Sequence, residues 1–346
     1  LGIAAINSYA ILDILDEVIA LKPDLVLVYT GHNEFYGALG AASMTSIGDS
    51  PGATRFILAM SKLRVMQLIS SLFSSGDTPP AAPGLMESLA KDKLVPKTSG
   101  LYTAGVDQFR YNLSEIFSGF NDAGIPVIAG TLVSNLLDQP PFYPELSGAG
   151  EAYKKGKDLF AAGKYREALD YLLLAKDSDE LRFRAPSEFN TIIRKVSEEH
   201  GALVVAVDSA FAAASNGGAV GNDLMTDHLH PNLKGYSLMA DAFLSGISAK
   251  GIINESPAIQ PGSIKLDSLT AIHFPFSRLD SAISFYRLAG ITSQWPFNRS
   301  GKKVELEAIR KPAGFIDSLA IQSARGEINW DAAHTKAAER FIALGD

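Results

Sequence analysis

The chain contains no cysteine among its 346 residues. This absence excludes disulfide bonds, thiolate metal sites and a cysteine nucleophile. No apolar run reaches the roughly 18 residues that a membrane-spanning helix needs. The formal net charge is −7 and Lys and Arg are not clustered, which argues against nucleic acid or an anionic membrane surface as the partner.

The composition is typical of a globular protein. Hydrophobic residues make up 47% of the chain and charged residues 20%, which at this length supports one sizeable core plus an accessory unit. Apolar runs of strand length alternate with longer segments of helical period, a pattern that predicts an α/β fold with a parallel sheet. The predicted strands are 25–29, 126–132 and 202–207, and the predicted helices include 8–21, 103–123 and 186–200.

Polar residues follow two of these predicted strands. A polar segment comes directly after the run 25–29, and a loop with further polar side chains follows the run 126–132. Open α/β sheets bind their ligands at the carboxyl ends of the strands. We therefore expect these side chains to line one edge of the sheet. The candidates are His32, Asn33, Glu34 and Asn135.

The segment 227–231 reads Asp-His-Leu-His-Pro and precedes a predicted helix that opens at Asn232. Asp227 and His230 are three residues apart, and Pro231 restricts the backbone just beyond them. At this spacing Asp227 can hold the tautomer of the His230 imidazole and stabilise the imidazolium that forms when the ring takes a proton from a nucleophile. Such a pair on a loop also serves surface hydrogen bonding or helix capping, so the segment alone leaves both interpretations open.

Two motifs in this order are similar to known sequence blocks. Gly31-His32-Asn33-Glu34, followed far downstream by Asp227-His228-Leu229-His230-Pro231, resembles the third and fifth blocks of the SGNH (GDSL-type) esterase and acyl-hydrolase superfamily. The opening residues 1–9 resemble its second block. The resemblance implies a flavodoxin-like three-layer fold with a parallel sheet, a serine nucleophile, and oxyanion donors from a backbone glycine and an asparagine side chain.

Carried over to this sequence, the resemblance assigns three catalytic roles. Asn33 becomes an oxyanion donor, His230 the general base, and Asp227 the partner of that base. His228, next to Asp227, joins the candidates for the pocket wall. No cofactor is implied by this chemistry.

The remaining roles fall at or before the start of the chain. Ala5 corresponds to the family's glycine oxyanion donor, with Gly2 three residues earlier, and an alanine still offers a backbone N–H. The block that carries the nucleophile precedes the second block, so we expect the catalytic serine upstream of Leu1. A triplet Gly48-Asp49-Ser50 follows the motif 31–34 instead of preceding it and has no buried strand before it. We interpret Ser50 as part of a turn.

Residues 151–178 interrupt the α/β alternation. Small residues and one tyrosine recur there at the spacings of a tetratricopeptide repeat, in which two antiparallel helices approach closely. One hairpin cannot bury its own apolar face, so it must dock on the core or on other helices. Such helices also offer a surface for a protein partner. The residues that carry the pattern are Gly156, Gly163, Tyr165, Ala168 and Ala175.

We divide the chain into four parts on this basis. The first is the beginning of an SGNH α/β core, the second a helical tetratricopeptide-like insert, the third the remainder of the core, and the fourth a linker with a helical C-terminal region. Two arginines just after the hairpin, Arg182 and Arg184, are candidates to meet an anionic substrate, although structural ion pairing is their default role. The four parts are 1–145, 146–200, 201–250 and 251–346.

The sequence favours a serine ester hydrolase or acyltransferase of the SGNH type. Its substrate would be a small acyl ester, with a carbohydrate as a candidate acceptor. One alternative is a metal-dependent hydrolase that uses His32, Asp227, His228 and His230, since neighbouring histidines can share a cation. The other is a non-catalytic scaffold, in which a degenerate core carries helical repeats that bind other chains.

Overall fold

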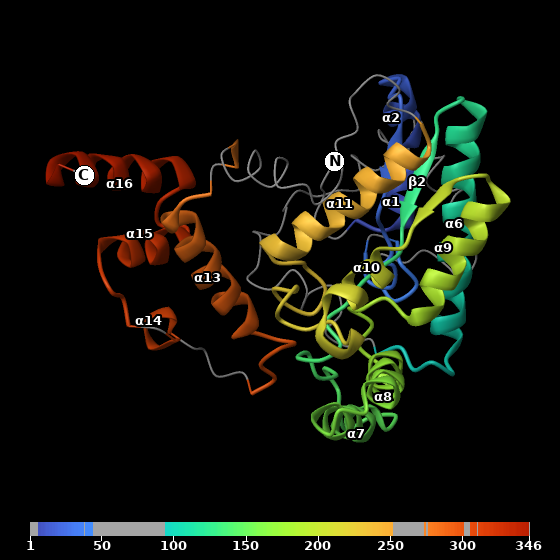
Figure 1. Cartoon of the computed structure of the whole chain (residues 1–346), viewed down its shortest axis with the longest axis horizontal. Coiled ribbons are helices and arrows are strands. Elements are labelled where there is room, and N and C mark those ends of the chain that lie inside the picture. The colour runs from blue at the N-terminus through green and yellow to red at the C-terminus, as the bar shows by residue number, and fades with distance from the viewer. Residues whose placement is uncertain are drawn as a thin grey trace, which may run out of the picture. The chain divides into compact units, whose positions relative to one another are not determined.

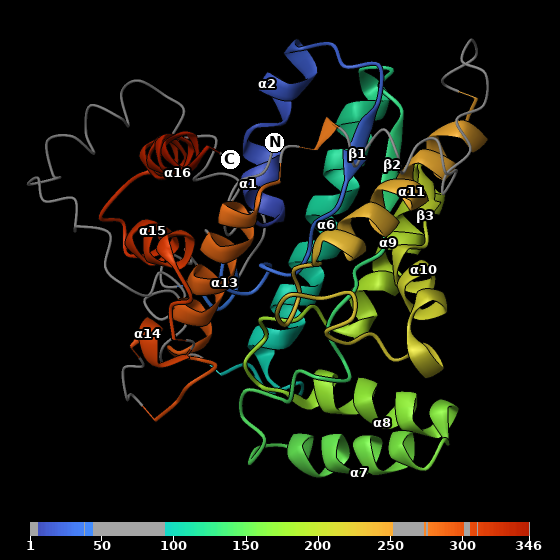
Figure 2. The same cartoon turned by 60° about the vertical axis from the view of Figure 1, so that its left-hand side comes forward.

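The computed structural model describes residues 6–37, 39–43, 94–251, 273–274, 276–300, 305–309 and 311–345. The chain divides into two compact units, Leu1–Pro261 (unit 1) and Gly262–Asp346 (unit 2). Figure 1 labels helices of both units and strand β2, and Figure 2 also labels β1 and β3. Three of the predicted positions, Gly2, Ala5 and Ser50, lie outside the described residues.

A parallel sheet forms the centre of unit 1. Strands β1 (Val26–Val28), β2 (Val127–Gly130) and β3 (Leu203–Val205) pair in the order β1-β2-β3. Ile128 lies opposite Leu27 on one side and Leu203 on the other. The α/β class with a parallel sheet is therefore confirmed.

The strands are shorter than the apolar runs that predict them, and β2 shows the reason. The N–H of Thr131 still donates to the Val205 carbonyl of β3 at 3.0 Å, and beyond it the backbone N–H groups change partners. The N–H of Leu132 donates to Asn190 Oδ1 at 2.7 Å, and the N–H of Val133 donates to Tyr29 Oη at 3.2 Å. Side chains thus replace the neighbouring strands as hydrogen-bond acceptors, and the strand ends where the loop begins.

Helices cover both faces of the sheet, as Figures 1 and 2 show. The helices α6 (Gly100–Asp122) and α9 (Ser187–Glu199) contact one face, and α11 (Leu233–Ala249) contacts the other and packs on α10 (Val207–Ala214). Phe243 of α11 belongs to the same apolar cluster as Ile128 of β2. The sheet and α11 therefore share one apolar core.

The predicted helix over 8–21 forms as two short helices that pack on α6. They are α1 (Ser8–Asp13) and α2 (Leu15–Ala20). Ile14 separates them, because its φ of −95° and ψ of 7° are not helical. The side chain of Asn7 caps α1 by accepting a hydrogen bond from the Ala10 N–H at 3.2 Å.

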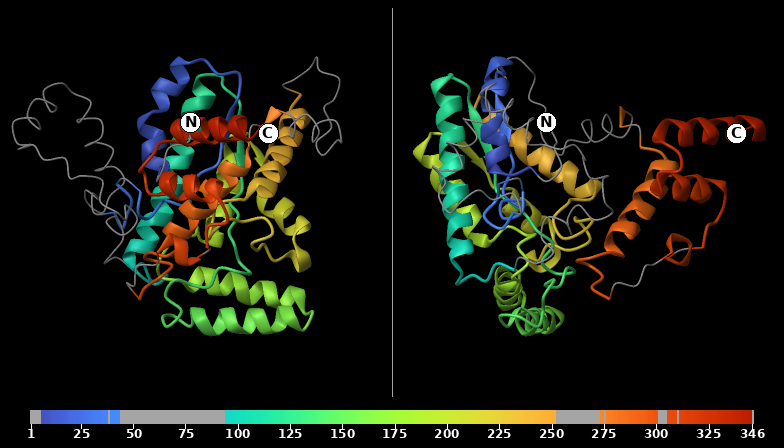
Figure 3. Two further views of the ribbon diagram at one scale, coloured as in Figure 1. Left: turned by 90° about the vertical axis from the view of Figure 1, so that its left-hand side faces the viewer. Right: turned by 180° about the vertical axis from the view of Figure 1, so that it is seen from behind.

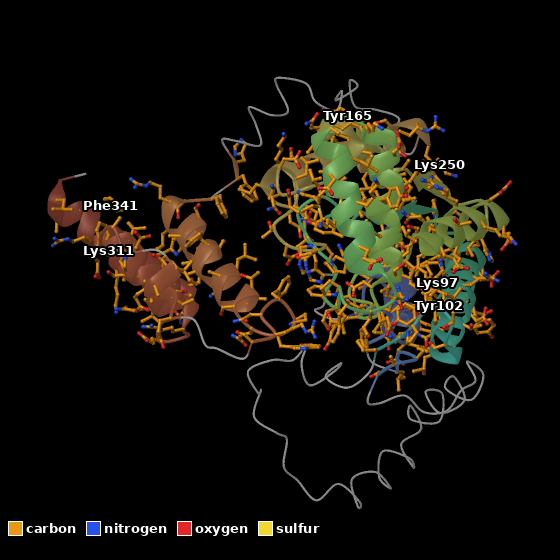
Figure 4. The ribbon with its side chains drawn as sticks, turned by 90° about the horizontal axis from the view of Figure 1, so that it is seen from below. Lys97, Tyr102, Tyr165, Lys250, Lys311 and Phe341 are labelled. Carbon is orange, nitrogen blue, oxygen red and sulfur yellow. The ribbon has the colours of Figure 1, made fainter. Side chains whose placement is uncertain are left out.

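Two antiparallel helices, α7 (Ala149–Ala161) and α8 (Tyr165–Ser178), form the hairpin expected between the second and third strands (Figure 3). They meet at Gly156, where an added Cβ would lie 2.8 Å from Leu172 Cγ. The ring of Tyr165, labelled in Figure 4, contacts the ring of Phe160 in a tilted arrangement, with ring centroids 5.1 Å apart and 57° between the ring planes. The Tyr165 ring also packs on Gly217 of the 3-10 turn η1 (Asn216–Gly218). This contact joins the hairpin to the rest of unit 1.

Unit 2 is helical where it is described. Its helices share an apolar cluster around Ile283, Tyr286 and Ile321. Within the described residues of both units, no helix combines the length and apolarity needed to cross a bilayer. The helices of unit 2 are α13 (Arg278–Thr292), α14 (Leu306–Ile309), α15 (Phe315–Ala324) and α16 (Trp330–Leu344).

Candidate active site

The Asp-His-Leu-His-Pro segment forms a closed turn between η1 and α11. Its two arms pair through an antiparallel bridge between Met225 and Pro231, and the Thr226 N–H donates to the His230 carbonyl at 2.7 Å. Helix α11 begins directly after it, at a close approach where an added Cβ on Gly235 would lie 2.3 Å from the Leu224 carbonyl oxygen. The backbone of the turn is therefore fixed by its own hydrogen bonds and by its packing against the start of α11.

Asp227 orients His230 through three hydrogen bonds. Its Oδ2 lies 2.7 Å from His230 Nδ1. Its Oδ1 accepts from the backbone N–H groups of Leu229 at 2.9 Å and His230 at 2.8 Å. The predicted hydrogen bond between the carboxylate and Nδ1 is confirmed, and it leaves Nε2 as the ring nitrogen that can take up a proton.

The charges of this pair reinforce each other. The hydrogen bond to Asp227 raises the pKa of His230, against the opposing effect of burial. Burial raises the pKa of Asp227, but hydrogen bonds from His228 and His230 outweigh it and bring that pKa well below its usual range. The His230 side chain is 59% exposed, so its outer nitrogen is open to a substrate.

Asn135 ties the loop after β2 to this turn. Its Nδ2 donates to the Asp227 carbonyl at 3.1 Å and to Asn222 Oδ1 at 2.8 Å. Its backbone N–H donates to the His228 carbonyl at 3.0 Å, and its Oδ1 accepts from the Asp138 N–H at 3.0 Å. All these bonds are internal, so Asn135 positions the turn that carries His230.

Asn33 lies on the turn that follows β1. The turn opens at Gly31, whose φ of 142° favours glycine and whose added Cβ would lie 2.6 Å from Leu132 Cδ1. The Asn33 side chain is half-buried and its Nδ2 donates to the Ile6 carbonyl at 3.3 Å. An amide nitrogen has two hydrogens, so one remains for a second acceptor.

Glu34 anchors this turn from beneath. Its carboxyl group is fully buried and accepts hydrogen bonds from the Ser8 N–H at 3.0 Å, from Ser8 Oγ at 2.6 Å and from the side chain of Gln108. Burial raises the pKa of Glu34, and these hydrogen bonds oppose the rise. The group therefore joins α1 and α6 to the Asn33 turn and does not face a substrate.

His32 and His228 are buried beside the exposed His230. The His32 Nδ1 accepts from the Ala185 N–H at 3.2 Å. Burial, followed by the charges of His228, Lys176 and His230, lowers the pKa of His32 to about 3. Burial likewise lowers the pKa of His228.

Both candidate arginines are buried in unit 1. The guanidinium carbon of Arg182 lies 5.1 Å from the ring centroid of Tyr102, which Figure 4 labels. Arg184 pairs with Asp179 at 3.4 Å and donates to the Asn135 carbonyl at 3.0 Å. These contacts give the arginines structural roles, and Arg184 supports the loop of Asn135.

Two residues that hold the site through hydrogen bonds belong to no sequence motif. Asn222 contacts Asn135 from a loop 87 residues away, and Gln108 reaches Glu34 across 74 residues. Gln108 does leave a signal in the sequence, because it and Asn112 are polar residues on the otherwise apolar, buried face of α6. Buried polar groups need partners, so this pair points to a polar group opposite the helix.

The arrangement supports proton transfer at His230 more than metal binding. Within the described part of the chain, no group of three or more His, Asp or Glu side chains could hold a metal ion. The Asp227 oxygens instead contact His230, the backbone of their own turn and, at 3.4 Å, His228 Nδ1.

Comparison of this chain with protein-family models, with curated proteins and with solved structures found no match.

Proposed function

We propose that this protein is a serine ester hydrolase or acyltransferase of the SGNH type, with a flavodoxin-like core, that acts on a small acyl ester. The observation that supports it most is the 2.7 Å hydrogen bond between Asp227 Oδ2 and His230 Nδ1, on a turn that leaves the ring exposed. That is the orientation a general base needs when its carboxylate partner sets the tautomer.

The proposed reaction begins with a serine in a segment that precedes Leu1, as the order of the family's blocks implies. The hydroxyl attacks the acyl carbonyl while His230 Nε2 takes its proton, and Asp227 stabilises the imidazolium. His230 then returns the proton to the leaving alcohol, and water or an acceptor hydroxyl releases the acyl group by the same steps. Asn33 Nδ2 and a backbone N–H, from Ala5 or Gly2, stabilise the oxyanion.

The test uses the intact protein and a fluorophosphonate, which labels activated serines. We expect one labelled serine, followed in sequence by the present chain, and turnover of 4-nitrophenyl acetate. His230→Ala should remove both labelling and turnover, with a loss of several orders of magnitude in kcat. His273→Ala is the matched control, because His273 is exposed and lies in unit 2. Full activity of His230→Ala would contradict the proposal.

A scaffold remains the second candidate function, favoured by one observation. Helix α8 exposes two large apolar side chains one turn apart, Tyr171 and Leu174, which is the kind of surface that marks protein contacts. An intact protein that fluorophosphonate leaves unlabelled, and that turns over no ester, would favour the scaffold.

A further inference from the structure

A cavity of about 160 Å³ lies between the helical hairpin and the core of unit 1. Helix α8 forms one wall. The segment after β2, helix α10 and the region around Val220 form the others. The lining is mainly apolar, and its largest side chains are Leu132, Val133, Leu136, Leu169, Leu173 and Val220.

The two ionised side chains on the cavity wall, Lys176 and Asp208, already have partners of opposite charge. Lys176 Nζ lies 3.3 Å from Asp177 Oδ1 and donates to the Ala185 carbonyl at 3.0 Å. Asp208 Oδ2 pairs with Arg194 at 2.9 Å. A charged ligand would lose its hydration without gaining an uncompensated partner on this wall, so the cavity disfavours ligand charge.

One polar group on the wall is available to a ligand. Ser134 is 7% exposed and lines the cavity. Its hydroxyl is the uncharged polar side-chain group on this lining. A hydroxyl can rotate to donate a hydrogen bond to a ligand acceptor placed in the cavity.

The volume sets the size of the ligand. An engineered apolar cavity of about 150 Å³ in another protein binds benzene, so the present cavity has room for one six-membered ring or a chain of similar bulk. We propose that the cavity binds a neutral, ring-sized apolar group with one hydrogen-bond acceptor directed at Ser134. The proposal concerns what the cavity binds and does not depend on the proposed catalytic chemistry.

The first test is a calorimetric titration of the intact protein with three probes that share one six-membered ring. Cyclohexanone is neutral and has one acceptor, whereas cyclohexanecarboxylate and cyclohexylammonium are charged. We expect saturable binding of cyclohexanone and at least about tenfold weaker binding of both charged probes, because their desolvation is not compensated. Equal binding of the carboxylate, or no binding of cyclohexanone, would overturn the proposal.

Variants locate the site. Leu173→Phe should fill the cavity and abolish cyclohexanone binding, whereas Leu174→Phe changes the neighbouring residue, which is 52% exposed, and should leave binding intact. Ala212→Leu narrows the cavity from α10 and serves if Leu173→Phe does not fold. Ser134→Ala should weaken cyclohexanone binding by about two- to tenfold and leave benzene binding unchanged. Binding that survives both filling variants would contradict the assignment.

The ligand can be a free small molecule or the acyl chain of an ester bound at His230, and a second experiment distinguishes these sources. Turnover of 4-nitrophenyl acetate and hexanoate is compared in the wild type and Leu173→Phe. A loss of kcat/KM for the hexanoate alone would identify the cavity as the acyl pocket. Unchanged turnover of both esters, with cyclohexanone binding lost, would identify a separate ligand site. Either result supports the proposal that the cavity binds a neutral group. Inactivity of the wild type towards both esters would contradict the proposed function and leave this proposal unaffected.

Discussion

Asp227 controls His230 with both oxygens of one carboxylate. One oxygen holds the imidazole and the other holds the backbone of the same turn. The side chain and the turn are therefore oriented together, so a substitution at position 227 changes the tautomer of the ring even where the backbone bonds survive. An asparagine at position 227 distinguishes these two roles. Its carbonyl oxygen can still accept from the backbone, whereas its NH₂ group cannot accept a hydrogen bond from His230 Nδ1.

If the proposed function holds, we expect Asp227→Asn in the intact protein to keep its fold and lose about 10⁴-fold in kcat, the loss that the wrong tautomer causes in a serine-hydrolase triad. The carboxylate raises the pKa of His230, and a base works only when neutral. The residual activity should accordingly extend to lower pH than in the wild type. The profile of kcat/KM against pH measures this, with Asp170→Asn on the exposed face of α8 as control. An acid limb that does not move would show that Asp227 does not act on His230.

At the scale of elements, the hairpin depends on a close approach between α7 and α8. Gly156 provides it, because any Cβ there meets Leu172, which is itself buried, and comes within 3.2 Å of the Ala168 carbonyl oxygen. The same helix α8 forms one wall of the cavity through Leu169 and Leu173. Separation of the two helices would therefore change both the hairpin and the cavity.

Gly156→Val should destabilise unit 1 by about 1–3 kcal/mol, the usual cost of an overpacked contact. Gly100→Val is the matched control, because nothing lies within 4 Å of a Cβ at the start of α6. Urea unfolding followed by circular dichroism measures the difference. The chain has two tryptophans, Trp295 and Trp330, and both lie in unit 2. The urea transition followed by tryptophan fluorescence should therefore be the same in both variants. Equal stability of the two variants would exclude a tight contact at Gly156.

At the scale of the whole molecule, the two units differ in their response to acid. Unit 1 contains buried neutral histidines, and the pKa of His32 is lowered to about 3 by burial. In unit 2, burial raises the pKa of Asp280, but hydrogen bonds from Ser277, Trp330 and His334 lower it to about 2. An unfolded chain therefore gains protons at His32 below about pH 6.5 and at Asp280 only below about pH 3.9.

The sign of the effect follows from the protons bound. Between about pH 6.5 and 3 the unfolded chain binds a proton at position 32 that the folded chain does not, so His32 lowers stability as pH falls, by up to about 1.4 kcal/mol per pH unit. His32→Gln removes this contribution. The difference in stability between variant and wild type should be constant above pH 7 and grow in favour of the variant below pH 6.

Urea titrations at several pH values, followed by circular dichroism, measure that difference. Tryptophan fluorescence supplies an internal control, because Asp280 contributes stability that is present above about pH 3.9 and is lost only as pH falls further toward 2. A pH-independent difference between wild type and His32→Gln would show that His32 is charged in the folded protein.

Local features could be predicted from the sequence because their parts are adjacent in the chain. Asp227 and His230 are three residues apart, so one turn determines their hydrogen bond. The apolar run around β1 and the Asn232 cap of α11 are likewise local. The small residues of the hairpin predict a close approach, because a missing side chain has the same consequence in any antiparallel pair.

The tertiary structure alone decides how distant segments support the site. His32 contacts Ala185 across 153 residues, and Asn135 contacts Asp227 across 92. No hydrophobic period and no local motif specifies such a pair. The chain has many polar residues that could donate or accept, and only the fold brings one of them within hydrogen-bond distance. The same holds for the neutral cavity between α8 and the core, whose walls come together only when the hairpin docks. The sequence determined which groups can do the chemistry, and the fold decided which of them are buried, paired or exposed, because burial is a property of the packed chain.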